Sequence, residues 1–187
     1  MSSPSSNAQN LTTLYDKVFY ADQISGSARS ASATVPRILK LFPWVSSVVD
    51  VGCGTGTWLH QFNLRGVSRV LGLDGGDATA DLMQIEKSGF LRTDLALPFD
   101  LKERFDLAMS LEVAEHLPVE FATNFVSNLV RLSDVIVFGA AIPGQGGTNH
   151  VNERWPSYWA ALFEKHGFLS NSQFKTCNRG VVDFPSV

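Results

Sequence analysis

The pattern of apolar and polar positions changes near Trp44. Before that point, residues 25–42 (SGSARSASATVPRILKLF) place apolar side chains at helical spacing, with Val35, Ile38, Leu39 and Phe42 on one side. This spacing predicts a helix that ends at Pro43. A shorter amphipathic pattern over residues 11–19 predicts an earlier helix. The Ser- and Asn-rich residues 1–12 lack any core-facing period, which predicts a disordered N-terminus.

After Trp44 the chain alternates between two kinds of segment. Short apolar runs, typical of buried strands, cover residues 47–52, 68–73, 89–93, 105–110 and 135–140. Helix-compatible stretches cover residues 57–63, 78–87, 119–132 and 157–166. Alternating strands and helices favour right-handed crossovers, and therefore an α/β fold: a Rossmann-like, doubly wound and mostly parallel sheet with helices on both faces.

Length and composition indicate one core. The chain has 187 residues, of which 44% are hydrophobic, enough for a single domain. We expect this domain over residues 13–187, with a helical lid over 13–43 and the Rossmann-like core over 44–187. Few residues remain after position 167 for the last elements of such a core, so the sequence favours a C-terminal truncation.

Charge and cysteine content restrict the setting and the partners. Fifteen Lys and Arg against eighteen Asp and Glu give a net charge of −3, which disfavours nucleic acid as a general partner. No apolar run approaches the roughly 18 to 20 residues that span a bilayer, and the polar start is unlike a secretory signal. Cys53 and Cys177 form no metal-binding cluster. We therefore expect a cytoplasmic protein with a small-molecule partner and no membrane contact, whose oligomeric state the sequence leaves open.

The strongest motif is a glycine loop that follows the first predicted strand. In VVDVGCGTGTWL, Gly52, Gly54 and Gly56 open a helix, so backbone N–H groups can approach a ligand at the carboxyl edge of the sheet. A tight turn without a ligand needs fewer glycines. A dinucleotide site would require glycine where Thr57 stands. Asp50 would repel a pyrophosphate, but it suits a ligand with a cationic ammonium or sulfonium group.

Acidic residues end the next two predicted strands. Asp74 can accept hydrogen bonds from both hydroxyls of a ribose. Asp94 can accept a bond from an adenine amino group while Leu95 packs against the ring. The alternative for Asp94 is a surface residue that caps the turn before Pro98.

Four motifs together resemble the class I S-adenosylmethionine-dependent methyltransferases: VVDVGCGTGTWL, GLDG, RTDL and FDLAMSLEVAEHL. The resemblance covers residues 44–166 and implies a seven-stranded sheet with one antiparallel strand, and S-adenosyl-L-methionine as cofactor. It also implies a cofactor role for each matching residue: Gly52, Gly54 and Gly56 against the methionine part, Asp50 orienting the loop and the ammonium group, Asp74 on the ribose, Asp94 and Leu95 at the adenine, and Ser110 and Leu111 beside the methionine.

The methyl acceptor would lie near the fourth and fifth predicted strands. His150 follows the loop PGQGGTN, and a histidine there can act as general base for a hydroxyl acceptor. The segment TNHVNERWPSYW resembles part of small bacterial methyltransferases of unassigned substrate, often associated with sugars or other metabolites. Glu153 and Arg154 form a solvated pair in the simplest interpretation. The aromatic residues stack on an acceptor or belong to the core: Trp155, Tyr158 and Trp159.

A metal site is the alternative use of this region. Glu112, Glu115 and His116 would share one face of a helix. With His150 they resemble metal-dependent O-methyltransferases that act on RNA ends or quinone precursors. In the simpler interpretation the two glutamates satisfy a helix N-terminus and His116 packs beside Leu117. The wider family carries EHL without a metal, so the prediction is that no metal is bound.

The leading hypothesis is an S-adenosylmethionine-dependent methyltransferase that acts on a small-molecule hydroxyl, a sugar or another metabolite, with His150 as catalytic base. One alternative is metal-dependent O-methylation of an RNA end or a quinone precursor. The other is a non-catalytic module that binds S-adenosylmethionine.

Overall fold

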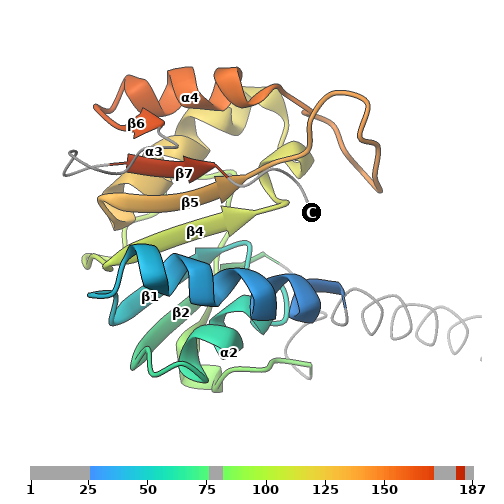
Figure 1. The fold of residues 1–187 in the computed structure, drawn as a ribbon. Helices are drawn as coiled ribbons and strands as arrows, with labels where there is room; N and C mark the ends of the chain where they lie inside the picture. The colour runs from blue at the N-terminus through green and yellow to red at the C-terminus, as the bar shows by residue number, and fades with distance from the viewer. Residues whose placement is uncertain (1–25, 76–81, 171–179, 184–187) are drawn as a thin grey trace, which may run out of the picture.

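A seven-stranded sheet with the order β3-β2-β1-β4-β5-β7-β6 forms the centre of the molecule (Figure 1). The computed structural model describes residues 26–75, 82–170 and 180–183. The strands are β1 (Ser47–Val51), β2 (Arg69–Asp74), β3 (Phe90–Arg92), β4 (Leu107–Leu111), β5 (Val135–Gly139), β6 (Leu169–Ser170) and β7 (Gly180–Asp183). Each of the five predicted runs overlaps a strand, and the Rossmann-like arrangement is confirmed.

Helices cover both faces of the sheet. They are a helix over residues 26–41, α2 (Thr57–Asn63), α3 (Ala122–Leu132) and α4 (Pro156–Glu164), with short 3-10 turns at η1 (Lys87–Gly89), η2 (Ala114–His116) and η3 (Val119–Phe121). Helix 26–41 and α2 lie on one face, α3 and α4 on the other (Figure 1). The predicted helix 11–19 and the terminus 1–12 lie outside the described residues.

The core has two halves because neighbouring strand residues point to opposite faces of the sheet. Val48 joins the cluster that contains Ile38 of helix 26–41 and Phe62 of α2. Val49 joins the cluster that contains Phe125 and other residues of α3 and α4. Helix 26–41, the described part of the predicted lid, therefore packs directly on the sheet. Within the described ranges, no helix has the length and apolar character needed to cross a bilayer.

The predicted antiparallel strand is wrong. All six strand pairings of the described sheet are parallel, including β5 with β7 and β6 with β7. The physical reason is the shortness of β6, which contributes only two residues to the ladder. β7 starts level with β6 and runs in the same direction, since Leu169 is paired with Gly180 and Ser170 with Val181.

The predicted helix over residues 78–87 is also wrong in its described part, where residues 82–86 form a turn and a bend before η1. Polar contacts with the glycine loop hold this segment instead. The Gln84 backbone N–H donates to the Thr55 carbonyl at 2.8 Å. The Gln84 side-chain amide donates to the Thr57 hydroxyl at 2.7 Å. These bonds use the groups that would otherwise support a helix or remain in solvent.

Truncation of a buried helix residue tests the α3 half of the core. Leu129 is 0% exposed on α3, so Leu129→Ala should lower the free energy of unfolding by about 2 to 5 kcal/mol. Leu64, 64% exposed beyond the end of α2, is the matched control. Leu64→Ala should change the free energy of unfolding by less than about 0.5 kcal/mol. Urea unfolding measures both; equal effects would contradict the packing described.

Candidate active site

The glycine loop is bound to the end of β2. Because the sheet is parallel, the carboxyl ends of β1, β2, β4 and β5 meet at one edge. The loop begins there, and the backbone N–H groups of Gly52 and Cys53 donate to the Leu73 carbonyl at 2.7 and 3.1 Å. The Gly54 N–H donates to Asp74 Oδ2 at 2.8 Å. The loop and the predicted ribose-binding acid therefore form one unit.

The three glycines of this loop meet different surroundings. Gly52 has a φ of +91°, and a Cβ there would lie 2.2 Å from Cγ2 of Val113, so only glycine fits. At Gly56 a Cβ would lie 3.0 Å from the Ile85 side chain. At Gly54 no atom lies within 4 Å of that position. The loop thus packs against protein at its two ends and faces open space at its middle glycine.

Two carboxyl groups make this edge of the sheet electrostatically unusual. Asp50 is 3% exposed within β1. Burial, together with the charge of Asp74, raises the pKa of Asp50 to about 8. A cationic group placed between these carboxyls would favour their ionised forms. These two carboxyl groups fit the ammonium and sulfonium groups of the expected cofactor better than they fit an anion.

The remaining predicted cofactor residues lie along the same edge. Asp94 is exposed, and its Oδ1 accepts a bond from the Ala96 N–H at 3.0 Å, which is the turn-capping alternative. Its role at an adenine stays a prediction. Leu95 is buried and Leu111 is half-buried. The fully buried Ser110 hydroxyl donates to the Val51 carbonyl at 2.8 Å and so ties β4 to β1 beside the loop.

The predicted helix over residues 112–116 is wrong. Glu112 has a left-handed φ of 55°, and its N–H donates to the Gly139 carbonyl of β5 at 3.0 Å. This bond continues the pairing of β4 with β5 past Leu111, and the left-handed backbone of Glu112 does not fit the first turn of a right-handed helix. Only residues 114–116 turn, as the 3-10 helix η2. Glu112 consequently does not share a helix face with Glu115 and His116.

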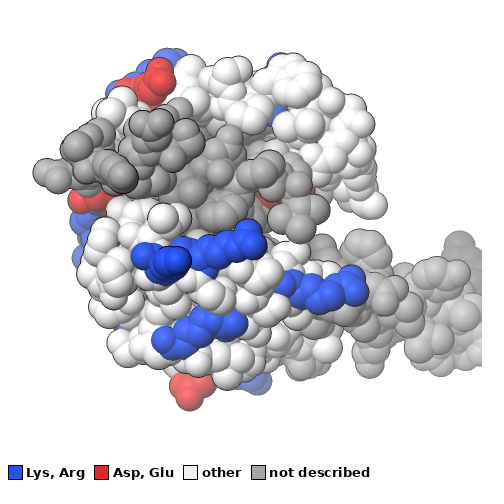
Figure 2. All heavy atoms as spheres, in the orientation of Figure 1, with Lys and Arg blue, Asp and Glu red and all other residues white. Residues whose placement is uncertain are grey.

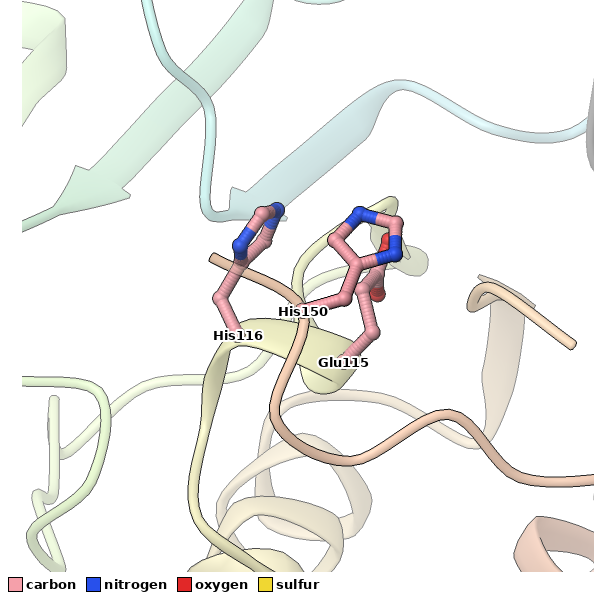
Figure 3. A group of neighbouring side chains, drawn as sticks. All are labelled: Glu115, His116 and His150. Atoms are coloured by element: carbon pink, nitrogen blue, oxygen red, sulfur yellow. The ribbon is translucent and has the colours of Figure 1, made fainter. Parts of the chain in front are cut away.

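Glu115, His116 and His150 nevertheless come together (Figure 3). Each offers a ligand atom, and these atoms lie within 4.8 Å of one another. The two imidazole rings meet edge to face, with centroids 4.9 Å apart. The N–H groups of Val151 and Asn152 donate to the Glu115 carbonyl at 2.9 and 3.0 Å, which fixes the His150 loop on η2.

Buried polar atoms without a hydrogen-bond partner occur at this place and on α4. Among the described residues they are both carboxylate oxygens of Glu115, Nδ2 of Asn152 and Nε1 of Trp159. Glu115 is 0% exposed, so a carboxylate there without a partner is costly. A glutamate beside two histidines matches the ligand types of a divalent metal site. Asn152 is buried as well, a feature that the sequence does not predict because an asparagine in a polar loop carries no signal of burial.

Glu112 lies outside this group of three but interacts electrostatically with Glu115. Partial burial, and then the charge of Glu115, raise its pKa. Its Oε2 accepts a long bond of 3.4 Å from the Gln145 side-chain amide. Of the four candidate metal ligands, the structure thus brings three together and leaves Glu112 at the rim.

Comparison with known proteins identifies the family. The model of a family described as "Methyltransferase domain" matches residues 23–177. This match covers most of the chain, and the chain therefore belongs to the methyltransferase-domain family. The resemblance to the class I S-adenosylmethionine-dependent methyltransferases is thereby confirmed.

Curated relatives share part of the sequence. A ubiquinone biosynthesis O-methyltransferase of Pseudomonas putida is 38% identical over 78 residues, which cover 38% of this chain and 33% of the relative. The enzyme of the same name from Rhodopseudomonas palustris is 31% identical over 123 residues, covering 62% and 43%. The matched part of the chain thus spans 33% to 43% of the length of these relatives.

Solved structures share the fold. An O-methyltransferase family protein from Burkholderia thailandensis has a TM-score of 0.66 at 15% identity, covering 91% of this chain and 60% of its own. The magnesium protoporphyrin IX methyltransferase of Synechocystis, solved with bound SAH, has a TM-score of 0.64 at 20% identity, covering 82% and 78%. At these identities the likeness concerns the fold.

The raised pKa of Asp50 predicts a pH dependence of stability. The unfolded carboxyl titrates near 3.8 and the folded one at about 8, so the folded state binds more protons between these values. The free energy of unfolding should therefore fall as pH rises through this interval, by at most about 1.4 kcal/mol per pH unit. Asp50→Asn removes this titration and should flatten the curve. Urea unfolding across the interval tests this, and parallel curves for the two proteins would refute it.

Proposed function

We propose that this protein transfers the methyl group of S-adenosyl-L-methionine to a hydroxyl oxygen of a small molecule, with His150 as general base. S-adenosylmethionine is the methyl donor of this class of enzyme. The cofactor would lie against the residues that the sequence predicts for it: Asp50, Gly52, Gly54, Gly56, Asp74, Asp94, Leu95, Ser110 and Leu111. The protein would act in the cytoplasm.

One observation carries the cofactor part of this proposal. The Gly54 N–H donates to Asp74, and the charge of Asp74 contributes to the raised pKa of the buried Asp50. This arrangement joins a backbone cradle to two acidic groups at the carboxyl edge of a parallel sheet. It supports a ligand that carries both a cationic part and a ribose.

The chemistry requires little from the protein besides alignment and one proton acceptor. When bound, S-adenosylmethionine would supply a methyl group on a cationic sulfur, and the acceptor oxygen would form a C–O bond to that carbon, in line with the sulfur, as the C–S bond breaks. His150 would take the hydroxyl proton, and the demethylated cofactor would leave as a neutral thioether. The His150 loop is bound to Glu115 of η2, close to Val113, which packs beside Gly52 of the glycine loop, and this proximity supports the division of roles.

The nature of the acceptor is supported by the relatives and by charge. The relatives named above are O-methyltransferases, which favours a hydroxyl, and quinone precursors are one class to test. Despite the negative net charge, Lys and Arg gather on one face (Figure 2), and Arg29, Arg37 and Lys40 are exposed on helix 26–41. That helix covers a face of the sheet, whereas His150 follows a strand end, so we propose a small-molecule acceptor rather than nucleic acid.

The test is methyl transfer from isotope-labelled S-adenosylmethionine to a panel of sugars, phenols and catechols, with mass detection of the demethylated cofactor and the methylated product. His150→Gln should leave cofactor affinity unchanged and lower turnover by about 100-fold or more. Full turnover by His150→Gln would contradict the assignment of His150 as general base. Cofactor binding without product from any acceptor would favour a non-catalytic binding module.

Substitution of Asp74 tests the cofactor site separately. If Asp74 accepts the ribose hydroxyls, Asp74→Ala should weaken cofactor binding by about 1 to 3 kcal/mol in calorimetric titration. Asp100→Ala is the control, because Asp100 pairs with Lys102 at an exposed site. Unchanged affinity of Asp74→Ala would contradict the assignment.

A second candidate is a metal-dependent form of the same reaction, favoured by the buried, unpartnered carboxylate of Glu115 beside His116 and His150. These three residues would hold a divalent cation, which supplies a Lewis acid that polarises the acceptor hydroxyl. In this form, EDTA abolishes turnover, Mg²⁺ or Mn²⁺ restores it, and Glu115→Gln loses the thermal stabilisation by the metal. In the leading form, EDTA leaves turnover unchanged.

A further inference from the structure

The carboxylate of Glu153 accepts three hydrogen bonds from one short stretch of chain. Its Oε2 accepts from the Gly144 N–H at 2.8 Å. Its Oε1 accepts from the Gly146 N–H at 2.9 Å and lies 3.0 Å from Nδ1 of His150.

The solvated pair of Glu153 and Arg154 that the sequence suggests is wrong. Arg154 Nε donates to the Asn152 side chain at 3.0 Å. The Arg154 guanidinium also lies over the ring of Tyr158, 5.2 Å from its centroid. The side chain of Glu153 is 21% exposed and that of His150 only 12%, so their contact lies largely out of solvent.

The chemistry of this contact determines which ring nitrogen carries the proton. An ionised carboxylate only accepts hydrogen bonds, so Nδ1 of His150 must be the donor. In the neutral ring Nε2 is then unprotonated and has a free electron pair. We propose that Glu153 is a positioning residue that holds His150 as the Nδ1–H tautomer and so presents the basic Nε2 to the acceptor.

A second glycine-rich loop, residues 144–147, takes part in this positioning. A Cβ at Gly147 would lie 2.3 Å from Nε2 of His150 and 2.4 Å from Cε1, so the ring packs where a side chain would stand. Glu153 thus binds two amides of the loop while the loop limits where the ring can turn. Figure 3 shows the rings of His150 and His116 beside each other, with Glu115 next to His150.

This inference rests on the proposed function, because it assigns a task to Glu153 through His150. The general-base form needs a free electron pair at Nε2, which the Nδ1–H tautomer supplies. The same tautomer serves the metal form when the cation is bound through Nε2.

Glu153→Gln tests the inference by two readouts in the full-length protein. Two-bond proton–nitrogen NMR spectra of the imidazoles, with His150 assigned by its absence in His150→Gln, should show the Nδ1–H tautomer in the wild type. Glu153→Gln should shift the ring toward the Nε2–H tautomer. It should also lower kcat by at least about tenfold with an unchanged KM for the cofactor.

Two further variants separate positioning from folding. Glu153→Asp keeps an acceptor-only group and should retain the Nδ1–H tautomer even if the loop shifts. Glu164→Gln, at an exposed site on α4, should match the wild type in both readouts. Circular dichroism identifies any variant that fails to fold, and Glu153→Asp then decides the result.

The outcomes are distinct from those of the proposed function. An Nε2–H tautomer in the wild type, or a tautomer and kcat unchanged in Glu153→Gln, would overturn the positioning role. Failure to find any methyl acceptor would overturn the proposed function, while the NMR spectra would still decide how Glu153 acts on His150.

Gly147→Ala offers an independent check through the loop. The added methyl group must displace the His150 ring, so the chemical shifts of that ring should change and kcat should fall as in Glu153→Gln. Gly26→Ala, where no atom lies within 4 Å of the new Cβ, is the matched control. An unmoved ring in Gly147→Ala would refute the packing argument.

Discussion

The hydrogen bonds between the glycine loop and the end of β2 determine the geometry of the loop at the carboxyl edge of the sheet, where we propose that the cofactor binds. Leu73 receives two loop N–H groups through its carbonyl, and Asp74 receives a third through its side chain. Protein groups alone thus hold the loop in shape, so a ligand bound there would not have to order it. The parallel sheet makes this possible, because it brings the ends of strands distant in sequence to one edge.

Buried polar groups are unevenly distributed in this molecule. The cores on the two faces of the sheet are almost wholly apolar, whereas Asp50 and Glu115 are buried near the carboxyl ends of strands. Burial of a carboxyl group costs free energy that packing elsewhere must offset. The concentration of such groups at one edge supports the view that stability is sacrificed there for ligand binding.

The sequence predicted the elements whose signal is local. Residues 57–63 form a helix within the predicted bounds, because their apolar spacing and the preceding glycine turn act over a few residues. The predictions of two helices, over residues 78–87 and 112–116, were wrong because contacts with distant parts of the chain decide the local structure there. Gln84 binds the glycine loop, and Glu112 binds β5. The grouping of Glu115 with His150 was suggested by a motif, but the bond between Glu153 and His150 depends on a loop fold that no periodicity encodes.

The position of β7 has a consequence for the order in which the sheet is assembled. β7 lies between β5 and β6 in the described sheet, although it follows both in sequence. α4 can pack on β5 early, through Trp159 against Phe138. β6 has no ladder partner until β7 inserts, so during synthesis from the N-terminus this edge closes last. The glycine loop of residues 52–56, by contrast, takes its contacts from β2, from residues 83–85 and from Val113, which all precede β6 and β7, so it can form before the sheet is complete.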